Sequence, residues 1–433
     1  MSETTATRIA KTGTLAVAAT VWCACAWLLA RTSVPSLRLS GLDAHRLFDA
    51  RLLRRSERFT RGEDILFALA TLTELGALGV LAVCLPRRIA RSRRGRLVRA
   101  GVAAGIVLVT LWLVRLPFEL AALWWRHRWG LGPFDPAAYL GAQWSTAGPE
   151  AVAAVLASVL LVALAGRFRR WWLPASPLLV ALVAAYLLGS GWLASAGTRP
   201  LRDPRLAADV RRLERVEHVG AVPVRVQDVS SQTTQANAFT DGFGPSVHVV
   251  LWSTLLDGRF TRREIDDVVA HELGHVRSRH VVKAIGWAAL GALPLLLLVD
   301  LAARRHGGLG DPASLPSVFL ALALLFVALT PVVNVVARRY EAEADWRALN
   351  ATRDPAAQRR LFERFAQTSL EQPAPPLLDY LWLENHPTLL QRIAMVERWA
   401  EASGGRPSRG GPGSPCRSCT WSRRPALPRA APS

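Results

Sequence analysis

Lysine is almost absent from this 433-residue chain, where it occurs only at Lys11 and Lys283. The net charge of +20 therefore comes almost wholly from arginine, a bias that indicates a GC-rich bacterial genome and not a nucleic-acid function. No nucleic-acid-binding motif accompanies the charge, and clusters such as PRRIARSRRGRLVR lie beside apolar runs, where arginines face anionic headgroups. We expect a lipid bilayer as a partner and no nucleic acid.

Cysteine is scarce as well. Of the five cysteines, Cys23, Cys25 and Cys84 lie in apolar runs, and Cys416 and Cys419 form a lone CRSC without a second pair. This placement excludes a small protein built on a disulfide framework.

Long apolar runs dominate the remainder, and 51% of all residues are hydrophobic. Each run approaches the ~20 residues with which a helix crosses the hydrocarbon. The runs are 12–30, 65–85, 101–125, 149–165, 171–196, 284–303 and 316–337. Arg8 and Lys11 precede the first run, as in a signal peptide, but no convincing cleavage site follows, so we interpret it as a membrane anchor. The composition predicts a polytopic membrane protein with about seven transmembrane helices.

The polar segments outline the domains. Residues 1–197 form a membrane domain with five spans, and 198–402 form a second domain interrupted by a two-span hairpin, 284–337. Alternating patterns at 222–229 and 246–252, with a turn at 241–246, predict a small sheet. The Gly, Pro, Ser and Arg of 403–433 predict a disordered tail. The fold class is mainly α, with a small α+β domain.

The segment DDVVAHELGHVRSRH, 266–280, carries the chemistry. Thr261 and Glu264 form a capping box that starts a helix, with no proline or glycine run before the membrane. Four residues apart, His271 and His275 project from one face and suit two corners of a zinc tetrahedron, while Glu272 beside them suits a general base for a metal-activated water. The alternative is a surface helix whose polar residues match the zinc-binding pattern by chance.

The segment ARRYEAEADWRA, 337–348, follows the last apolar run on an expected helix. Glu341 would complete a His, His, Glu ligand set for one zinc ion per chain. Asp345, one turn later, would hold a histidine ligand by its ring N–H. Glu343 points elsewhere on this helix, and the alternative for the whole segment is an exposed acidic face.

A third segment, ENHPTLLQRIAMVERW at 384–399, contains His386 before a proline that suits a first helical turn. Alone, this histidine would mean little. Beside a metal, His386 would stabilise the oxyanion of a tetrahedral intermediate, and Arg392 would assist it or orient it.

These segments together resemble the membrane gluzincin peptidases of the CAAX prenyl protease type I and HtpX kind. The likeness covers 198–400 through HELGH, E-A-E-A-D and N-H-P followed by R-I, and RLPFELAALWWRHRWGLG at 115–132 is similar to the N-terminal domain of CAAX proteases. The resemblance implies a zincin-type metalloendopeptidase domain with water-activated peptide hydrolysis.

The resemblance has two further implications. CAAX-type proteases are hollow helical barrels, so Glu74, Arg115 and Glu119 would line a water-filled chamber, the alternative being that Arg115 snorkels to the interface. Asn237, Ala238 and Phe239 match the edge strand with which gluzincins hold an extended peptide, although Asn237 also suits a plain turn.

We therefore predict an integral-membrane zinc metalloendopeptidase that acts on membrane-associated, prenylated or unfolded proteins. Prenylated substrates imply CAAX processing, whereas a bacterial source favours membrane quality control. The rival is an idle membrane scaffold or lipid-binding protein, which would have no reason to retain Glu272 together with all three ligands. We expect a bacterial cell membrane from the arginine-rich composition. The resemblance implies that the zinc domain is cytoplasmic and the N-terminus opposite, although the seven arginines of 86–100 would then face outward.

Overall fold

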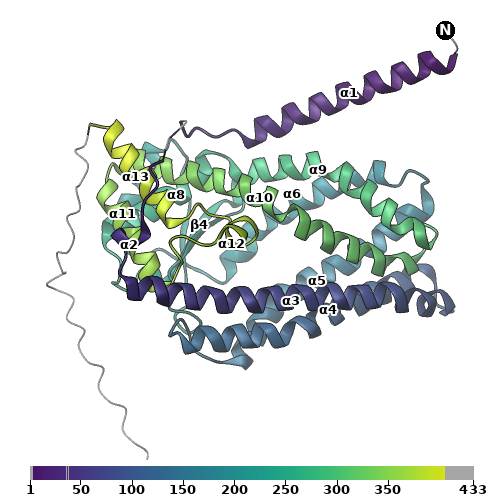
Figure 1. Cartoon of the computed structure of the whole chain (residues 1–433), viewed down its shortest axis with the longest axis horizontal. Helices are drawn as coiled ribbons and strands as arrows, with labels where there is room; N and C mark the ends of the chain where they lie inside the picture. The colour runs from purple at the N-terminus through teal and green to yellow at the C-terminus, as the bar shows by residue number, and fades with distance from the viewer. Residues whose placement is uncertain (1–2, 36, 38, 405–433) are drawn as a thin grey trace, which may run out of the picture.

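The computed structural model describes residues 3–35, 37 and 39–404, so the predicted tail lies almost wholly outside the described residues. Long helices make up the membrane part, and their bounds are α1 (Glu3–Ala30), α3 (Ala50–Arg91), α4 (Arg96–Arg128), α5 (Pro136–Arg167), α6 (Trp172–Ala196), α9 (His280–Ala303) and α10 (Leu315–Thr352). Figure 1 shows α3 to α6, α9 and α10 running along the length of the molecule, while α1 projects away from it.

Six predicted spans are confirmed, because α3, α4, α5, α6, α9 and α10 are the helices in the described residues that are long and apolar enough to cross a membrane. The first predicted run lies on α1, whose described apolar part is Ala16–Ala30. This helix is tied to the bundle, since the indole N–H of Trp22 donates to the carbonyl of Leu290 on α9 at 3.1 Å. The protein is a multi-pass membrane protein.

Asp-Pro pairs begin several helices. Asp135, Asp203 and Asp354 are the N-caps of α5, α7 (Pro204–Val216) and α11 (Pro355–Thr368), and each is followed by proline at the first helical position. The aspartate accepts a free backbone N–H of the first turn, and proline loses nothing there because that N–H has no helical partner. These starts are therefore set locally.

A four-stranded sheet has the order β1-β2-β4-β3, from β1 (Arg199–Pro200), β2 (Val224–Gln227), β3 (Ala238–Asp241) and β4 (His248–Trp252). β2 and β4 pair in parallel, and β3 pairs antiparallel with β4, with Phe239 opposite Val250. The strands predicted at 222–229 and 246–252 are confirmed as β2 and β4. Strand β3 lies at the edge of the sheet, as the resemblance implied.

In the polar domain, residues 198–283 and 338–402, α8 (Arg262–Arg277) packs against β3 and β4, while α7, α10 and α11 pack against α8. Besides α7, α8 and α11, the shorter helices of this domain are α12 (Leu377–Trp382) and α13 (Leu389–Ala402), and the short helix α2 (Ala44–Leu47) precedes α3. Their core contains Leu273 of α8, Leu349 of α10 and Ile393 of α13, all fully buried.

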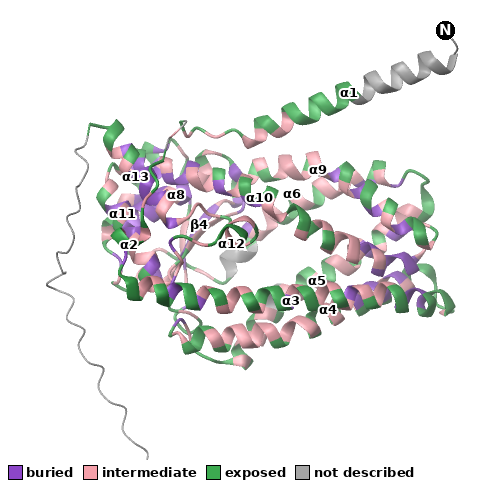
Figure 2. Ribbon diagram, in the orientation of Figure 1, coloured by how far each residue is buried: buried purple, intermediate pink, exposed green. Residues whose placement is uncertain are grey.

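Figure 2 shows buried residues gathered at the two ends of the molecule. One group is the core of the polar domain, and the other joins α3, α4, α9 and α10 at the far end through residues such as Leu85, Val107 and Val299. The bundle is thus packed at its ends. Between them lies a cavity of about 880 Å³ lined by residues of α3, α4, α10 and α12.

The helix that carries HELGH does not continue into the membrane, and the expectation of an uninterrupted helix is wrong here. α8 ends at Arg277, and Arg279 takes a left-handed conformation with φ of 55° before α9 begins at His280. No proline or glycine marks this break, so local composition gave no signal of it.

Candidate metal centre

Helix α8 places both histidines of HELGH. The predicted capping box is confirmed, because Thr261 N–H donates to Glu264 at 2.7 Å and Thr261 Oγ1 accepts from Glu264 N–H at 3.4 Å. Buried Val269 and Leu273 fix the inner face of the helix. The Nε2 atoms of His271 and His275 converge to 3.1 Å, as the spacing of four residues predicted.

Helix α10 brings Glu341 to the same point. Its Oε2 lies 3.2 Å from His271 Nε2, and its Oε1 lies 3.5 Å from His275 Nε2. Gly274 makes this approach possible, because a Cβ there would lie only 3.3 Å from the Cα and the carbonyl oxygen of Ala344. The glycine of HELGH therefore sets the distance between the two helices.

The three side chains suit a metal ion. One ligand atom from each of His271, His275 and Glu341 lies within 4.8 Å of the others, and imidazole with carboxylate is a donor set typical of catalytic zinc. Glu341 Oε2 is buried and makes no hydrogen bond of acceptable geometry among the described residues. A cation placed between these side chains would satisfy the buried oxygen together with the two ring nitrogens.

The electrostatics favour positive charge at this point. Burial by itself would lower the pKa of His271, but Asp345 and Glu341 outweigh it and raise that pKa to about 10. The cluster thus holds an excess of negative charge that a bound cation would neutralise.

Asp345 holds the ring of His271. Its Oδ1 accepts from His271 Nδ1–H at 2.9 Å, and this bond turns the ring so that Nε2 is directed at Glu341. Arg392 donates twice to Asp345, at 2.8 and 2.7 Å, and only 1% of the aspartate side chain is exposed. Arg392 thereby supports His271 through Asp345, and its role in assisting or orienting His386 stays a prediction.

Glu272 has a partner that the sequence did not reveal. Thr240 Oγ1 of strand β3 lies 2.8 Å from Glu272 Oε2, to which it donates, and 3.1 Å from the backbone oxygen of the same residue. The edge strand and the carboxylate predicted as the base are therefore joined. In the sequence, the only indication of this contact is that Thr240 directly follows Asn-Ala-Phe, the segment expected to hold the peptide.

His386 lies in the loop between α12 and α13, with its Nε2 at 3.1 Å from Glu341 Oε2. Arg338 of α10 positions this loop, because its guanidinium donates to the carbonyls of Tyr380 and Glu384 at 2.7 and 2.5 Å. The third sequence segment thus meets the first two, and 44% of the His386 side chain remains exposed.

The predicted peptide-binding residues lie beside the centre. Asn237 and Ala238 line a small cavity of about 80 Å³ together with His271, Glu272 and His386. The side chain of Asn237 accepts from the N–H of Ala238 at 2.9 Å, a local bond typical of a turn asparagine. Phe239 continues the edge strand. Substrate contact by Asn237, Ala238 and Phe239 stays a prediction.

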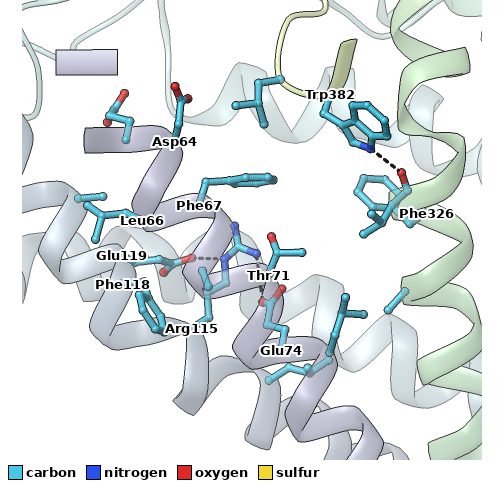
Figure 3. A pocket seen from close by; sticks show the side chains of 18 of the residues that line it. Asp64, Leu66, Phe67, Thr71, Glu74, Arg115, Phe118, Glu119, Phe326 and Trp382 are labelled. Carbon is cyan, nitrogen blue, oxygen red and sulfur yellow. Dashed lines mark hydrogen bonds and ion pairs between the residues drawn. The ribbon is translucent and has the colours of Figure 1, made fainter. Parts of the chain in front are cut away.

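The large cavity contains the charged cluster expected in the spans (Figure 3). Arg115 of α4 pairs with Glu74 of α3 at 3.1 Å and with Glu119 at 2.8 Å. Tyr139 of α5 also donates to Glu119, at 3.0 Å. The charges face one another and the cavity, as expected of residues that line a chamber. That this chamber is filled with water stays a prediction. Trp382 and Leu383 close one side, and His386 follows three residues later.

Comparison with known proteins agrees with this arrangement. Residues 200–400 match the sequence model of Peptidase family M48. The chain is 29% identical over 209 residues to "Uncharacterized metalloprotease YhfN" of Bacillus subtilis, covering 46% of this chain and 49% of that protein. It is 29% identical over 245 residues to a "Protease HtpX homolog" of Acidiphilium cryptum, covering 51% of this chain and 83% of that protein.

A third relative, "CAAX prenyl protease 1 homolog" of Oryza sativa, is 27% identical over 188 residues, or 40% of this chain and 42% of that protein. The chain thus spans about half the length of some of these relatives and most of the HtpX homolog. The crystal structure of S. mikatae Ste24p superposes with a TM-score of 0.64 at 17% identity, over 88% of this chain and 97% of that one, which establishes the fold.

Proposed function

Residues 200–400 of this multi-pass membrane protein belong to peptidase family M48, and on that premise we propose that the chain is an integral-membrane zinc metalloendopeptidase. The observation that carries the proposal is the convergence of His271, His275 and Glu341 within 4.8 Å, with Glu272 next to it on α8. An idle scaffold or lipid-binding protein would gain nothing from a base beside a metal site.

In this proposal His271, His275 and Glu341 hold one zinc ion per chain. When bound, zinc polarises a carbonyl and lowers the pKa of a nearby water molecule. Glu272 accepts the proton of the attacking water, and Thr240 holds the carboxylate for that task through its 2.8 Å bond. His386 donates from Nε2 to the oxyanion that develops on the scissile carbonyl.

The edge strand β3 would hold the peptide. An extended segment beside Ala238 and Phe239 would pair with the free side of β3 through backbone hydrogen bonds, which work for any side chains. Since Thr240 of the same strand bonds Glu272, a peptide on β3 would be aligned with the base. Asn237 at the start of the strand is the proposed side-chain contact.

The proposed substrates are membrane-associated proteins. A cavity of about 880 Å³ among the spans, with apolar walls and the Arg115 cluster, suits a segment that leaves the bilayer for the metal centre. For a bacterial protein we favour quality control of membrane proteins over processing of prenylated ones. We place the zinc domain on the cytoplasmic side of the bacterial cell membrane.

The test compares purified wild-type protein with Glu272→Gln and with Glu363→Gln, a half-exposed glutamate of α11. We expect about one zinc per chain in all three by elemental analysis. Peptide hydrolysis should fall ~10²–10⁴-fold in Glu272→Gln alone, the usual contribution of a general base. Wild-type rates from Glu272→Gln would refute the mechanism. Membrane proteomes of cells expressing wild type or Glu272→Gln would then identify substrates that accumulate.

A further inference from the structure

We propose that Glu343 and His280 form a relay that orients His275 and ties the metal centre to the chain segment after α1. This inference rests on the proposed function and deepens it, because it assigns positioning roles to two residues outside the ligand set. Glu343, which points away from the metal centre on the sequence pattern, is central to it.

Glu343 lies in a buried cluster on the far side of His275 from His271. Its side chain is 4% exposed, and its Oε1 accepts from both the backbone N–H and the hydroxyl of Ser33, at 2.8 and 2.7 Å. Its Oε2 lies 3.1 Å from Nε2 of His280, which is also buried. A buried carboxylate with this many partners is a built site and not a chance surface contact.

The hydrogen bonds define which nitrogen of each ring carries a proton. Because a carboxylate only accepts, His280 donates from Nε2 to Glu343, and its Nδ1 is left with a lone pair. That lone pair lies 2.9 Å from His275 Nδ1, so His275 donates from Nδ1. The Nε2 lone pair of His275 then faces Glu341. The relay therefore presents His275 in the tautomer that a metal ligand requires.

The break between α8 and α9 creates this contact. On a continuous helix, residues five apart are separated by about 140° around the axis, so His280 would face away from His275. The left-handed Arg279 turns the chain, and the two rings come to 4.9 Å between centroids. A left-handed backbone is uncommon for arginine, and the contact between His275 and His280 accounts for this conformation at Arg279.

The relay continues into the segment that follows α1. Lys283 Nζ donates to the carbonyl of Arg31 at 3.0 Å and lies 3.4 Å from Glu343. Tyr340 stacks on the His280 ring at 4.4 Å and donates to the carbonyl of Leu29 at 2.7 Å. Residues 29–33, the end of α1 and the chain just after it, are thus held by Glu343, Lys283 and Tyr340, of which Glu343 and Tyr340 contact His280. Displacement of this segment would loosen His275.

The two histidine ligands are supported in parallel but from different parts of the protein. His271 is held by Asp345 and Arg392, both of the polar domain. His275 is held by His280 and Glu343, whose further partner Ser33 belongs to the N-terminal part of the chain. The support of His271 thus lies within the polar domain, whereas the support of His275 depends on the position of the chain segment after α1.

The central experiment uses the full chain in detergent and measures zinc affinity by chelator competition, together with the visible spectrum of the Co²⁺-substituted protein. His280→Asn places an amide oxygen where Nδ1 lies, whereas His280→Gln places its amide near Nε2. We expect His280→Gln and Glu343→Ala to weaken zinc binding ~10–100-fold and to change the Co²⁺ spectrum, as loss of a ligand's partner does. His280→Asn should retain most of the affinity.

A second pair of variants tests the N-terminal connection. Ser33→Ala removes one of the two hydrogen bonds from Ser33 to Glu343 Oε1. Zinc binding should weaken by a few-fold, because one hydrogen bond to a charged group is lost and the surrounding side chains relax in part. Thr20→Val on α1, whose hydroxyl donates to the carbonyl of Ala16 one turn earlier in the same helix, should leave zinc affinity unchanged.

Equal zinc affinity and equal Co²⁺ spectra for His280→Asn, His280→Gln and wild type would overturn the relay. So would an effect of Thr20→Val as large as that of Ser33→Ala. A wild-type protein that binds no zinc would instead refute the proposed function, so the two failures are distinguishable.

Discussion

Replacing Arg392 with methionine should destabilise the protein strongly, because it leaves a buried carboxylate without its cation. Arg392 is 8% exposed, donates two hydrogen bonds to Asp345 and lies with its guanidinium 4.1 Å above the ring of Phe362. Methionine keeps most of the apolar stem and removes the charge, the donors and the contact of the guanidinium with the Phe362 ring. The change therefore acts mainly on the ion pair.

The geometry sets the magnitude. Breaking a buried ion pair by removing one partner costs ~3–5 kcal/mol, since the remaining charge stays desolvated. For a domain of this size, each kcal/mol lowers the unfolding midpoint by ~2–4 °C, so we expect a fall on the order of 10 °C. Zinc affinity should also drop, by ~10–100-fold, because Asp345 holds His271.

Differential scanning fluorimetry of the full chain in detergent measures the midpoint, and Arg359→Met is the matched control. Arg359 also pairs with two carboxylates, Glu363 at 2.9 Å and Glu397 at 3.0 Å, but these are 32% and 30% exposed. Partly exposed pairs contribute only ~0–1 kcal/mol, so this midpoint should fall by a few degrees at most.

The double variant Asp345→Asn with Arg392→Met gives the sharpest test. It removes both charges, so no orphan carboxylate remains, and it should be more stable than Arg392→Met alone. If both arginine variants lost the same stability, or if the double variant were the least stable of all, the account of Asp345 as a buried charge held by Arg392 would be wrong.

Three other predictions follow from the structure. Thr240→Val should leave zinc content intact and lower kcat ~10-fold or more, because one hydrogen bond to the Glu272 carboxylate is lost; an unchanged kcat would remove Thr240 from the mechanism. Burial, reinforced by Asp209, raises the pKa of Asp266 to about 6 from an ordinary 3.8, so the folded state gains up to ~3 kcal/mol as the pH falls from 7 towards 4. The unfolding midpoint of wild type minus that of Asp266→Asn should therefore increase as the pH falls from 7 towards 4. A difference that does not change with pH would contradict the raised pKa of Asp266. A reporter active only outside the cytoplasm should be silent after Arg398 and active within 86–100, and the reverse would place the zinc domain outside.

Local sequence patterns predicted the proposed ligand set and determined the helix starts. Two histidines four residues apart must share a helix face, and the periodicity of 3.6 residues does not depend on what packs against that face. The caps at Thr261, Asp135 and Asp354 satisfy backbone donors within three residues. The apolar runs likewise predicted the spans by length alone, because the thickness of the bilayer sets that length.

Contacts across long sequence separations were decided only by the tertiary structure. Thr240 bonds Glu272 from a strand, Ser33 bonds Glu343 across most of the chain, and Arg392 turns to Asp345. No periodicity encodes such pairs, because they depend on how closely and at what angle helices pack. The break at Arg279 illustrates the reason: its left-handed backbone follows from the packing of His280 beside His275, and not from the preferences of the arginine.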